Sequence, residues 1–140
     1  MKIPFAKYSE PEKITGNEIV ILIDTIGFLN TCYQLSDLAI VAGSFTPKIG
    51  GHNVLEPVFA GTPVFFGPYM FSQEELKKIT LQNKCAKQID LNEIRAEIEN
   101  YFKGENRSLK ENCKNLTKAL SGQLEKTYRI LKNILVNKSS

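Results

Sequence analysis

The sequence has no tryptophan, one histidine and only three cysteines in 140 residues. The cysteines, Cys32, Cys85 and Cys113, are widely spaced, which argues against a disulfide framework, a C-x-x-C redox motif and a zinc site. The longest strictly aliphatic run, residues 19–23, is far too short to span a bilayer, and residues 1–12 lack the apolar stretch of a signal peptide. A reducing cytosol and a site without a metal are therefore expected.

Positive charge is concentrated in the C-terminal part of the chain. The formal net charge is only +3, which is too weak to argue for a nucleic-acid partner. Residues 103–140 carry nine Lys or Arg against three Glu, so this segment is net +6 and the remainder is net −3. Two interpretations stay open: a basic helix face lying near anionic lipid headgroups, or an ordinary solvated face.

Short β-branched runs alternate with helix-like segments along most of the chain. The predicted strands are 3–8, 18–24, 38–42, 64–66 and 86–89; the predicted helices are 29–36, 53–60, 72–82 and one ending at 102. A basic amphipathic helical segment follows over 105–138, with an interruption expected near Gly122. The pattern predicts one α/β domain over residues 1–140, a Rossmann-like parallel sheet with helices on both faces and a long C-terminal helix.

Residues 43–68, GSFTPKIGGHNVLEPVFAGTPVFFGP, carry most of the functional signal. A predicted strand ends in a glycine-rich loop, and an apolar helix is expected to start where that loop ends. This arrangement holds phosphates in α/β proteins, because unpaired N–H groups and the helix dipole favour negative charge there. Ligands of parallel sheets bind at the carboxyl ends of the strands, so the loops after Ile23, Ala42 and Phe66 are expected to form one cleft.

Each polar residue of this loop has a functional and a structural interpretation. Gly50 and Gly51 permit close approach of a phosphate or simply form a tight loop. His52 can donate a hydrogen bond to an anion or cap the helix, and Asn53 is a good N-cap by itself. Glu56 lies one turn into an apolar helix. It can accept hydrogen bonds from two ribose hydroxyls, or its negative charge can simply interact favourably with the positive N-terminal end of the helix dipole. Lys48 can neutralise a phosphate or be an ordinary surface lysine.

Taken together, this pattern resembles the donor-binding half of the 3-deoxy-D-manno-octulosonic acid (Kdo) transferases, GT-B-type glycosyltransferases of lipopolysaccharide synthesis. That family's pattern is G-G-S, a short loop, G-G-H-N-x-L-E-P, then G-x-P-V and G-P. The D-T-I-G at 24–27 resembles a further turn of the family. The resemblance is close over residues 19–72. In the rest of the chain only the general pattern of the sequence resembles the family. The matching residues are Gly43, Ser44, Gly50, Gly51, His52, Asn53, Leu55, Glu56, Pro57, Gly61, Pro63, Val64, Gly67 and Pro68.

The resemblance implies a Kdo transferase that takes Kdo from CMP-Kdo to a lipid A precursor at the cytoplasmic face of the inner membrane. CMP-Kdo is then the donor substrate, and no cofactor or metal is expected. Glu56 is expected to hold the ribose, and the loop before it the phosphate. The implied nucleotide-sugar-binding residues are Ser44, Lys48, Gly50, Gly51, His52, Asn53, Glu56, Gly67 and Pro68.

The chain departs from the family pattern in two residues and in extent. Ala42 stands where the family has the first glycine of G-G-S, and Phe28 stands where a Glu usually follows D-T-x-G. The acceptor-binding half, which supplies the general base, is not recognisable, so no catalytic residue is expected here and the chain alone is expected to be inactive. The first strand of the donor half is also missing, which predicts an N-terminally truncated GT-B half with unpaired edges, open to homodimer formation or rearrangement.

Two other functions remain open. One is another GT-B glycosyltransferase that uses a UDP-sugar, which would bind UDP more tightly than CMP. The other is a non-catalytic α/β module that binds a partner through its basic C-terminal helix. Neither explains Glu56 and the G-G-H-N sequence together.

Overall fold

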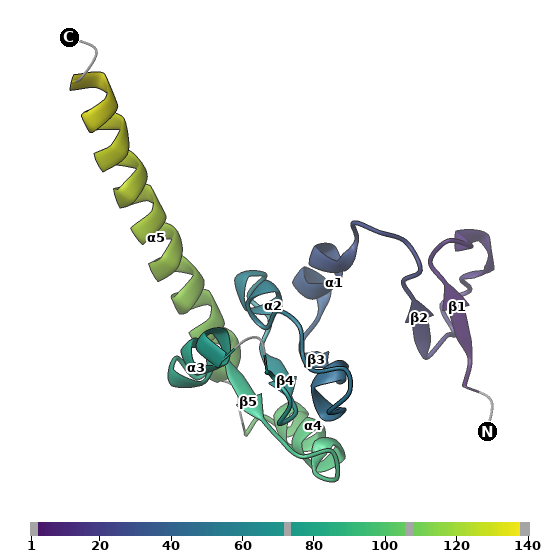
Figure 1. Ribbon diagram of the computed structural model, residues 1–140. Helices are drawn as coiled ribbons and strands as arrows, with labels where there is room; N and C mark the ends of the chain where they lie inside the picture. Colours follow the sequence, from purple (N-terminus) through teal and green to yellow (C-terminus); the bar gives the residue numbers. More distant parts are fainter. Residues whose placement is uncertain (1–2, 72–73, 106–107, 138–140) are drawn as a thin grey trace.

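The computed structural model describes residues 3–71, 74–105 and 108–137, with side chains up to residue 122. It has five strands, all in parallel pairs, arranged as two separate sheets (Figure 1). The first sheet pairs β1 (Phe5–Lys7) with β2 (Val20–Leu22). The second has the order β3-β4-β5, with β3 at Ala39–Val41, β4 at Val64–Phe66 and β5 at Ala86–Gln88. All five predicted strands are present, each within its predicted range.

The strand β4 is the centre of the larger sheet and its three residues are fully buried. Side chains alternate between the two faces of a strand, and here Val64 and Phe66 join one hydrophobic cluster while Phe65 joins the other. Removing a phenylalanine side chain from water contributes about 1.5–3 kcal/mol. The apolar run at 64–66 therefore forms a strand covered on both faces, as parallel sheets require.

Helices cover both faces of this sheet, which confirms the predicted fold class. One cluster joins α2 (Leu55–Phe59), α3 (Glu74–Gln82) and the first part of α5 (Ser108–Asn137) to the strands. The other joins α4 (Ile94–Lys103) to Phe65. The remaining helix, α1 (Leu29–Leu35), precedes β3 and contacts α2. The helix α5 is continuous, so the predicted interruption near Gly122 is wrong. Ser72, where the predicted helix 72–82 begins, lies outside the described residues.

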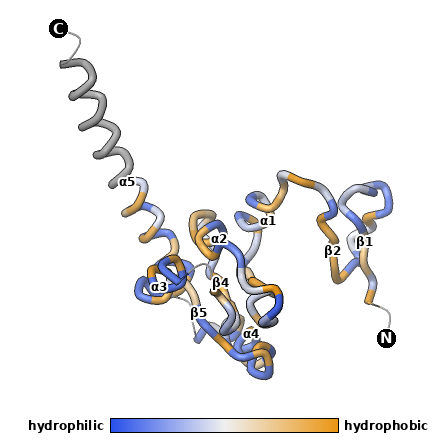
Figure 2. The backbone as a smooth tube through the Cα atoms, viewed as in Figure 1, coloured by the Kyte–Doolittle hydropathy of each residue, from blue (hydrophilic) through white to orange (hydrophobic). Residues whose placement is uncertain are grey.

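The β1–β2 sheet stands apart from the rest of the molecule, where one continuous sheet was expected (Figure 1). Figure 2 colours the backbone of β2 orange, because its residues are hydrophobic. Val20, Ile21 and Leu22 are 43%, 40% and 48% exposed, although β-branched runs of this kind are typical of strands buried on both faces. The two sheets are joined through residues 23–38, which include the D-T-I-G turn and α1.

No helix in the described ranges is both long and apolar enough to cross a membrane. Figure 1 shows α5 projecting away from the sheet that its first turns cover.

The buried cysteines support a prediction about thiol reactivity. Cys85 and Cys113 are fully buried, and the Cys113 thiol donates to the Cys85 carbonyl oxygen at 3.5 Å. The neighbouring Cys85 thiol and burial raise the pKa of Cys113, so little reactive thiolate forms at Cys113, and Cys85 is protected by its complete burial. Titration with an aromatic disulfide reagent should modify one thiol, the half-exposed Cys32, in the native chain and three after unfolding. Rapid modification of all three in the native state would contradict this packing.

Candidate functional site

The loop after β3 and the turn after β4 are tied together by Ser44. Its buried hydroxyl donates to the Val41 carbonyl oxygen at 2.5 Å and accepts the Gly67 N–H at 2.6 Å. The Ser44 carbonyl oxygen accepts the N–H of Tyr69 at 2.9 Å. Ser44 is predicted to lie near a bound phosphate. In the structure its hydroxyl forms two hydrogen bonds, one as donor and one as acceptor, and these join the ends of β3 and β4.

Gly50 and Gly51 bring the loop against the same turn. Gly50 has φ of +74°, a conformation that favours glycine, and its N–H donates to Thr46. The N–H of Gly51 donates to the Tyr69 carbonyl oxygen at 2.7 Å. A Cβ on Gly51 would lie 1.8 Å from the sulfur of Met70 and 3.0 Å from the Cβ of Ser44, so the buried Met70 side chain would have to move to admit it. The N–H groups of Gly50 and Gly51 therefore both form hydrogen bonds within the protein, and neither is left free for a phosphate.

His52, Asn53 and Glu56 form the outward side of the loop at the start of α2. The Asn53 side-chain oxygen accepts the Leu55 N–H at 2.9 Å, so Asn53 caps the helix as its residue type predicts. Its side-chain amide donates to a Glu56 carboxylate oxygen at 3.4 Å. His52 and Glu56 are exposed. The carboxylate is therefore held at the mouth of the loop, on the solvent side of a helix whose Pro57 and Val58 are buried.

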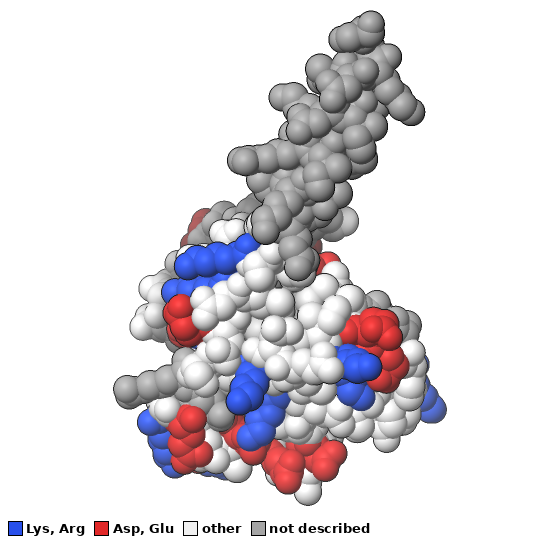
Figure 3. Space-filling model, turned by 90° about the vertical axis from the view of Figure 1, so that its left-hand side faces the viewer, with Lys and Arg blue, Asp and Glu red and all other residues white. Residues whose placement is uncertain are grey.

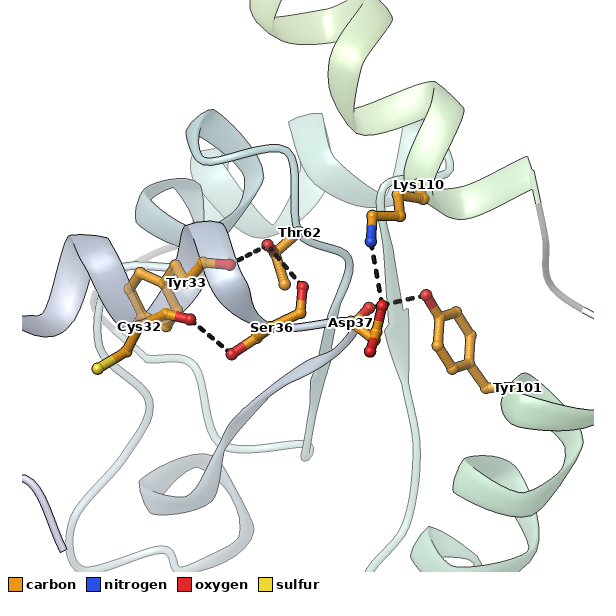
Figure 4. A network of polar contacts seen from close by, with 7 residues as sticks. All are labelled: Cys32, Tyr33, Ser36, Asp37, Thr62, Tyr101 and Lys110. Carbon is orange, nitrogen blue, oxygen red and sulfur yellow. Dashed lines mark hydrogen bonds and ion pairs between the residues drawn. The ribbon is translucent and has the colours of Figure 1, made fainter. Parts of the chain in front are cut away.

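The pKa of Tyr33, in α1, depends on burial and also on the charge of Glu56. Burial and then the nearby Glu56 carboxylate raise the pKa of Tyr33. Its backbone is fixed from the other side, because the Thr62 hydroxyl donates to the Tyr33 carbonyl oxygen at 2.5 Å (Figure 4). In the same view Asp37 receives the Tyr101 hydroxyl at its carbonyl oxygen, at 2.7 Å, and the Lys110 ammonium at its carboxylate, at 3.1 Å. These contacts fix the end of α1 and the residues that follow it against Thr62, α4 and α5.

Positive charge can reach the loop from Lys48, which is exposed within it. Pro68 is also exposed, while Gly67 beside it is buried. Figure 3 shows acidic and basic side chains interspersed around a broad uncharged area on one side of the molecule. Among the described residues, no group of three or more His, Cys, Asp or Glu side chains could hold a metal ion.

The D-T-I-G turn lies on the smaller sheet, so the structure does not bring it into the expected common cleft. Asp24 accepts the Ser9 N–H at 3.0 Å and the Ser9 hydroxyl at 2.7 Å, which joins the carboxyl ends of β1 and β2. The Ser9 hydroxyl is the main cause that holds the pKa of Asp24 below its usual value. Within the described chain, the hydroxyl of Thr25 is buried without a hydrogen-bond partner.

The two departures from the family pattern have simple structural explanations. Ala42 is exposed, so a methyl group is accommodated there. At the next position a Cβ on Gly43 would lie 2.5 Å from the Gly50 carbonyl oxygen, so that glycine is needed. Phe28 packs against Tyr8, with ring centroids 4.6 Å apart. An aromatic contact thus stands where a carboxylate was expected.

Three residues near the loop were not singled out from the sequence. Met70 fills the space that Gly51 leaves, Tyr69 holds the loop through its backbone, and the pKa of Tyr33 is raised by burial and then by the Glu56 carboxylate. No periodicity marks Met70 or Tyr69, since both lie in a connecting segment. Tyr33 has helical spacing with other apolar residues, a pattern that indicates a packing face and says nothing about a neighbouring carboxylate.

Comparison with known proteins gives a consistent result. No family model matches the chain. The 3-deoxy-D-manno-octulosonic acid transferase of Chlamydia pneumoniae is 34% identical over 140 residues, 96% of this chain and 31% of that protein. The transferase of Chlamydia muridarum is 31% identical over 133 residues, 94% of this chain and 31% of that protein. That of Aquifex aeolicus is 48% identical over 67 residues, 48% of this chain and 18% of that protein.

One solved structure shares the fold. The C-terminal CMP-Kdo binding domain of WaaA from Acinetobacter baumannii matches with a TM-score of 0.68 and 23% identity, over 81% of this chain and 60% of that one. The present chain spans about a third of the length of the curated relatives it matches. Sequence and fold together therefore relate this chain to the 3-deoxy-D-manno-octulosonic acid transferases, as the counterpart of one part of those proteins.

Proposed function

We propose that this chain supplies the donor site of a Kdo transferase, an enzyme that takes Kdo from CMP-Kdo to a lipid A precursor in lipopolysaccharide biosynthesis. Support comes from the related transferases and from the fold shared with a CMP-Kdo binding domain. The observation that carries the proposal is the exposed Glu56 carboxylate in the first turn of α2, directly beyond the G-G-H-N loop.

The phosphate of CMP is assigned to the outward side of the loop. The Gly50 and Gly51 amides already donate within the protein, so the phosphate contacts fall to His52 and the backbone at Asn53, with Lys48 nearby. The helix α2 has only five residues, and its dipole is correspondingly limited. Lys48 and the His52 ring N–H are therefore expected to carry much of the stabilisation of the leaving phosphate. Ser44, Gly67 and Pro68 act by fixing the shape of this mouth, and the scheme uses no metal ion.

Glu56 is assigned to the two ribose hydroxyls of CMP. A hydrogen bond to a charged group contributes about 1.5–3 kcal/mol, so Glu56→Ala is expected to weaken CMP binding about tenfold to hundredfold. Calorimetric titration of CMP into the wild-type chain and the variant measures this directly.

Glu111→Ala is the matched control, because Glu111 is an exposed carboxylate in the first turn of another helix, α5. It should leave CMP affinity within about twofold of wild type. Equal affinities of the wild type and both variants would remove Glu56 from the site.

In the reaction of the whole enzyme, an acceptor hydroxyl attacks the anomeric carbon of Kdo, CMP leaves and the configuration inverts. The residues of this chain contribute by binding the donor and by stabilising charge on the departing phosphate. The general base is assigned to the acceptor-binding part, which is not recognisable in these 140 residues. The chain alone is therefore expected to bind donor without turnover.

The two other functions are distinguished in the same titration. Tighter binding of UDP than of CMP would favour a GT-B transferase that uses a UDP-sugar. A folded chain that binds neither nucleotide, and that is unchanged by Glu56→Ala, would favour a non-catalytic α/β module. The contact between Asn53 and Glu56 favours the CMP-Kdo site, because it holds an exposed carboxylate toward the loop and adds little to the core.

We also propose that the basic α5 lies near the anionic cytoplasmic face of the inner membrane in the whole enzyme. Lys110, Lys114 and Lys118 occupy successive turns of α5 and line a groove of about 360 Å³ beside Gly61 and Thr62. Lysines near a charged bilayer contribute about 1 kcal/mol each. The acceptor-binding part of the enzyme would then bind the lipid acceptor at the same membrane surface.

A further inference from the structure

The groove of about 360 Å³ beside α5 brings together side chains from three helices. Its walls include Gln34 of α1, Phe59 of α2 and three lysines of α5, Lys110, Lys114 and Lys118. No Asp or Glu of the described residues lines it. The volume falls within the range of pockets that bind small molecules. This groove is called the lysine groove below.

The positive charge of the lysine groove is only partly compensated within the protein. Residues four apart on a helix lie on one face, and like charges at this spacing repel each other. Lys110 is compensated, because its ammonium group lies 3.1 Å from the carboxylate of Asp37 (Figure 4). Lys114 and Lys118 are exposed, and neither forms an ion pair with a carboxylate in the described part of the chain. An anion bound between these two lysines would neutralise the charge and relieve the repulsion.

A structural role at the end of α2 does not account for these lysines. Cations near the C-terminal end of a helix can bond to its last carbonyl oxygens. Here the carbonyl oxygens of residues 56–58 already accept the N–H groups of residues 60–62. The carbonyl oxygen of Val58 also accepts the hydroxyl of Thr117, at 3.1 Å. The ammonium groups are therefore not needed to end α2 and stay available to a ligand.

The lysine groove and the candidate donor site lie at opposite ends of the parallel strands. Thr62, which lines the groove, lies just before β4, and Gln34 belongs to α1, which precedes β3. The glycine-rich loop instead follows β3, and Gly67 follows β4. A nucleotide bound at that loop would therefore leave the lysine groove open, and the two sites can be tested separately.

We propose that the lysine groove is a second binding site, which takes one phosphate group attached to an apolar body. Lys114 and Lys118 pair with the phosphate, and the side-chain amide of Gln34 donates a hydrogen bond to it from α1. Phe59, which is 48% exposed in the same groove, contacts the apolar body. The site is more specific than an attraction of α5 to a charged bilayer, because it also requires side chains of α1 and α2. The phosphate can belong to a soluble ester or to a lipid headgroup.

Phenyl phosphate is a suitable probe, because it joins a phosphate to an aromatic ring. Its titration into the isotopically labelled 140-residue chain should give saturable amide shifts at Gln34, Thr62, Lys114 and Lys118. Inorganic phosphate should shift the same residues with an affinity about tenfold lower, because it lacks the apolar contact. Absence of shifts at these residues in a folded chain, or shifts confined to the glycine-rich loop, would overturn the proposal.

Two lysine variants separate the groove from general charge. Lys114→Gln should weaken phenyl phosphate binding about fivefold, and glutamine is nearly as good a helix former as lysine, so the fold should persist. Lys78→Gln is the matched control, because Lys78 is an exposed lysine of α3 that does not line the groove. It should change the affinity by no more than about twofold. Equal losses in the two variants would mean that net charge alone attracts the anion, which would overturn the site.

A competition experiment with vesicles of phosphatidylglycerol identifies the source of the phosphate. Release of bound phenyl phosphate from the wild-type chain by the vesicles would show that a lipid headgroup enters the groove. Retention of phenyl phosphate in the presence of the vesicles would assign the groove to a soluble phosphate ester. Shifts of His52 and Glu56 on titration with CMP report on the donor loop separately and should be unchanged in Lys114→Gln, so either proposal can fail without the other.

Discussion

Gly67→Ala is expected to lower the free energy of unfolding by about 3 kcal/mol, the upper part of the range for overpacked sites. A Cβ at this position would lie 2.5 Å from the Ser44 carbonyl oxygen and 2.7 Å from the ring of Phe45. The first of these atoms belongs to the backbone and cannot move away by a change of rotamer. The loop after β3 and the turn after β4 would have to separate, which strains the hydrogen bond between the Gly67 N–H and Ser44.

Urea unfolding followed by circular dichroism measures this loss. Gly122→Ala is the control, because a Cβ there meets open space in α5 and alanine is the better helix former by about 1 kcal/mol. The control should be neutral or stabilising. A Gly67→Ala variant as stable as the control would mean that the two loops are not packed against each other in solution.

Ser44→Ala is expected to cost about 2–3 kcal/mol of unfolding free energy, with little change in side-chain volume. The buried hydroxyl bridges two backbone groups, donating to the Val41 oxygen and accepting from the buried Gly67 N–H. Removing one partner of a buried hydrogen bond leaves the other unsatisfied at a cost of about 1–3 kcal/mol. The same unfolding experiment measures the effect.

Ser36→Ala is the matched control for Ser44→Ala. The Ser36 hydroxyl is partly buried and donates to the Cys32 carbonyl oxygen, so its removal strips a bond from one acceptor only. A loss of about 1 kcal/mol or less is expected. If both serine variants lost the same stability, the double role of Ser44 between β3 and β4 would be wrong.

Much of the fold could be predicted because the strands are short continuous apolar runs. Residues 64–66 form β4 as predicted, since Val64, Phe65 and Phe66 have no polar face to expose and are bounded by Pro63 and Gly67. The position of α2 followed from Asn53 as a capping residue and from Gly61 after the helix. These signals are local, so the sequence alone contains them.

The division into two sheets could not be read from the residues of β1 and β2. Val20, Ile21 and Leu22 have the pattern of a buried strand, and pattern alone does not say whether the covering layer is present. The resemblance predicted a missing strand and unpaired edges.

The nucleotide-binding roles of the candidate-site residues stay predictions, and the structure shows how the loop that carries them is built. Glu56 and His52 are exposed at the loop, as a ligand site requires. Gly50 and Gly51 have a different use from the expected one, because their amides bond to Thr46 and Tyr69. Met70, whose side chain fills the space beside Gly51, lies in a connecting segment without periodicity, so its role depends on tertiary packing.

The central claim is that a cytidine nucleotide binds at the outward side of the G-G-H-N loop. The most direct measurement is the change in backbone amide chemical shifts of the isotopically labelled 140-residue chain on titration with CMP. The account predicts saturable shifts at Lys48, His52, Asn53 and Glu56, all weakened in Glu56→Ala. Shifts confined to the lysine-lined groove of α5, or no shifts in a folded chain, would contradict it.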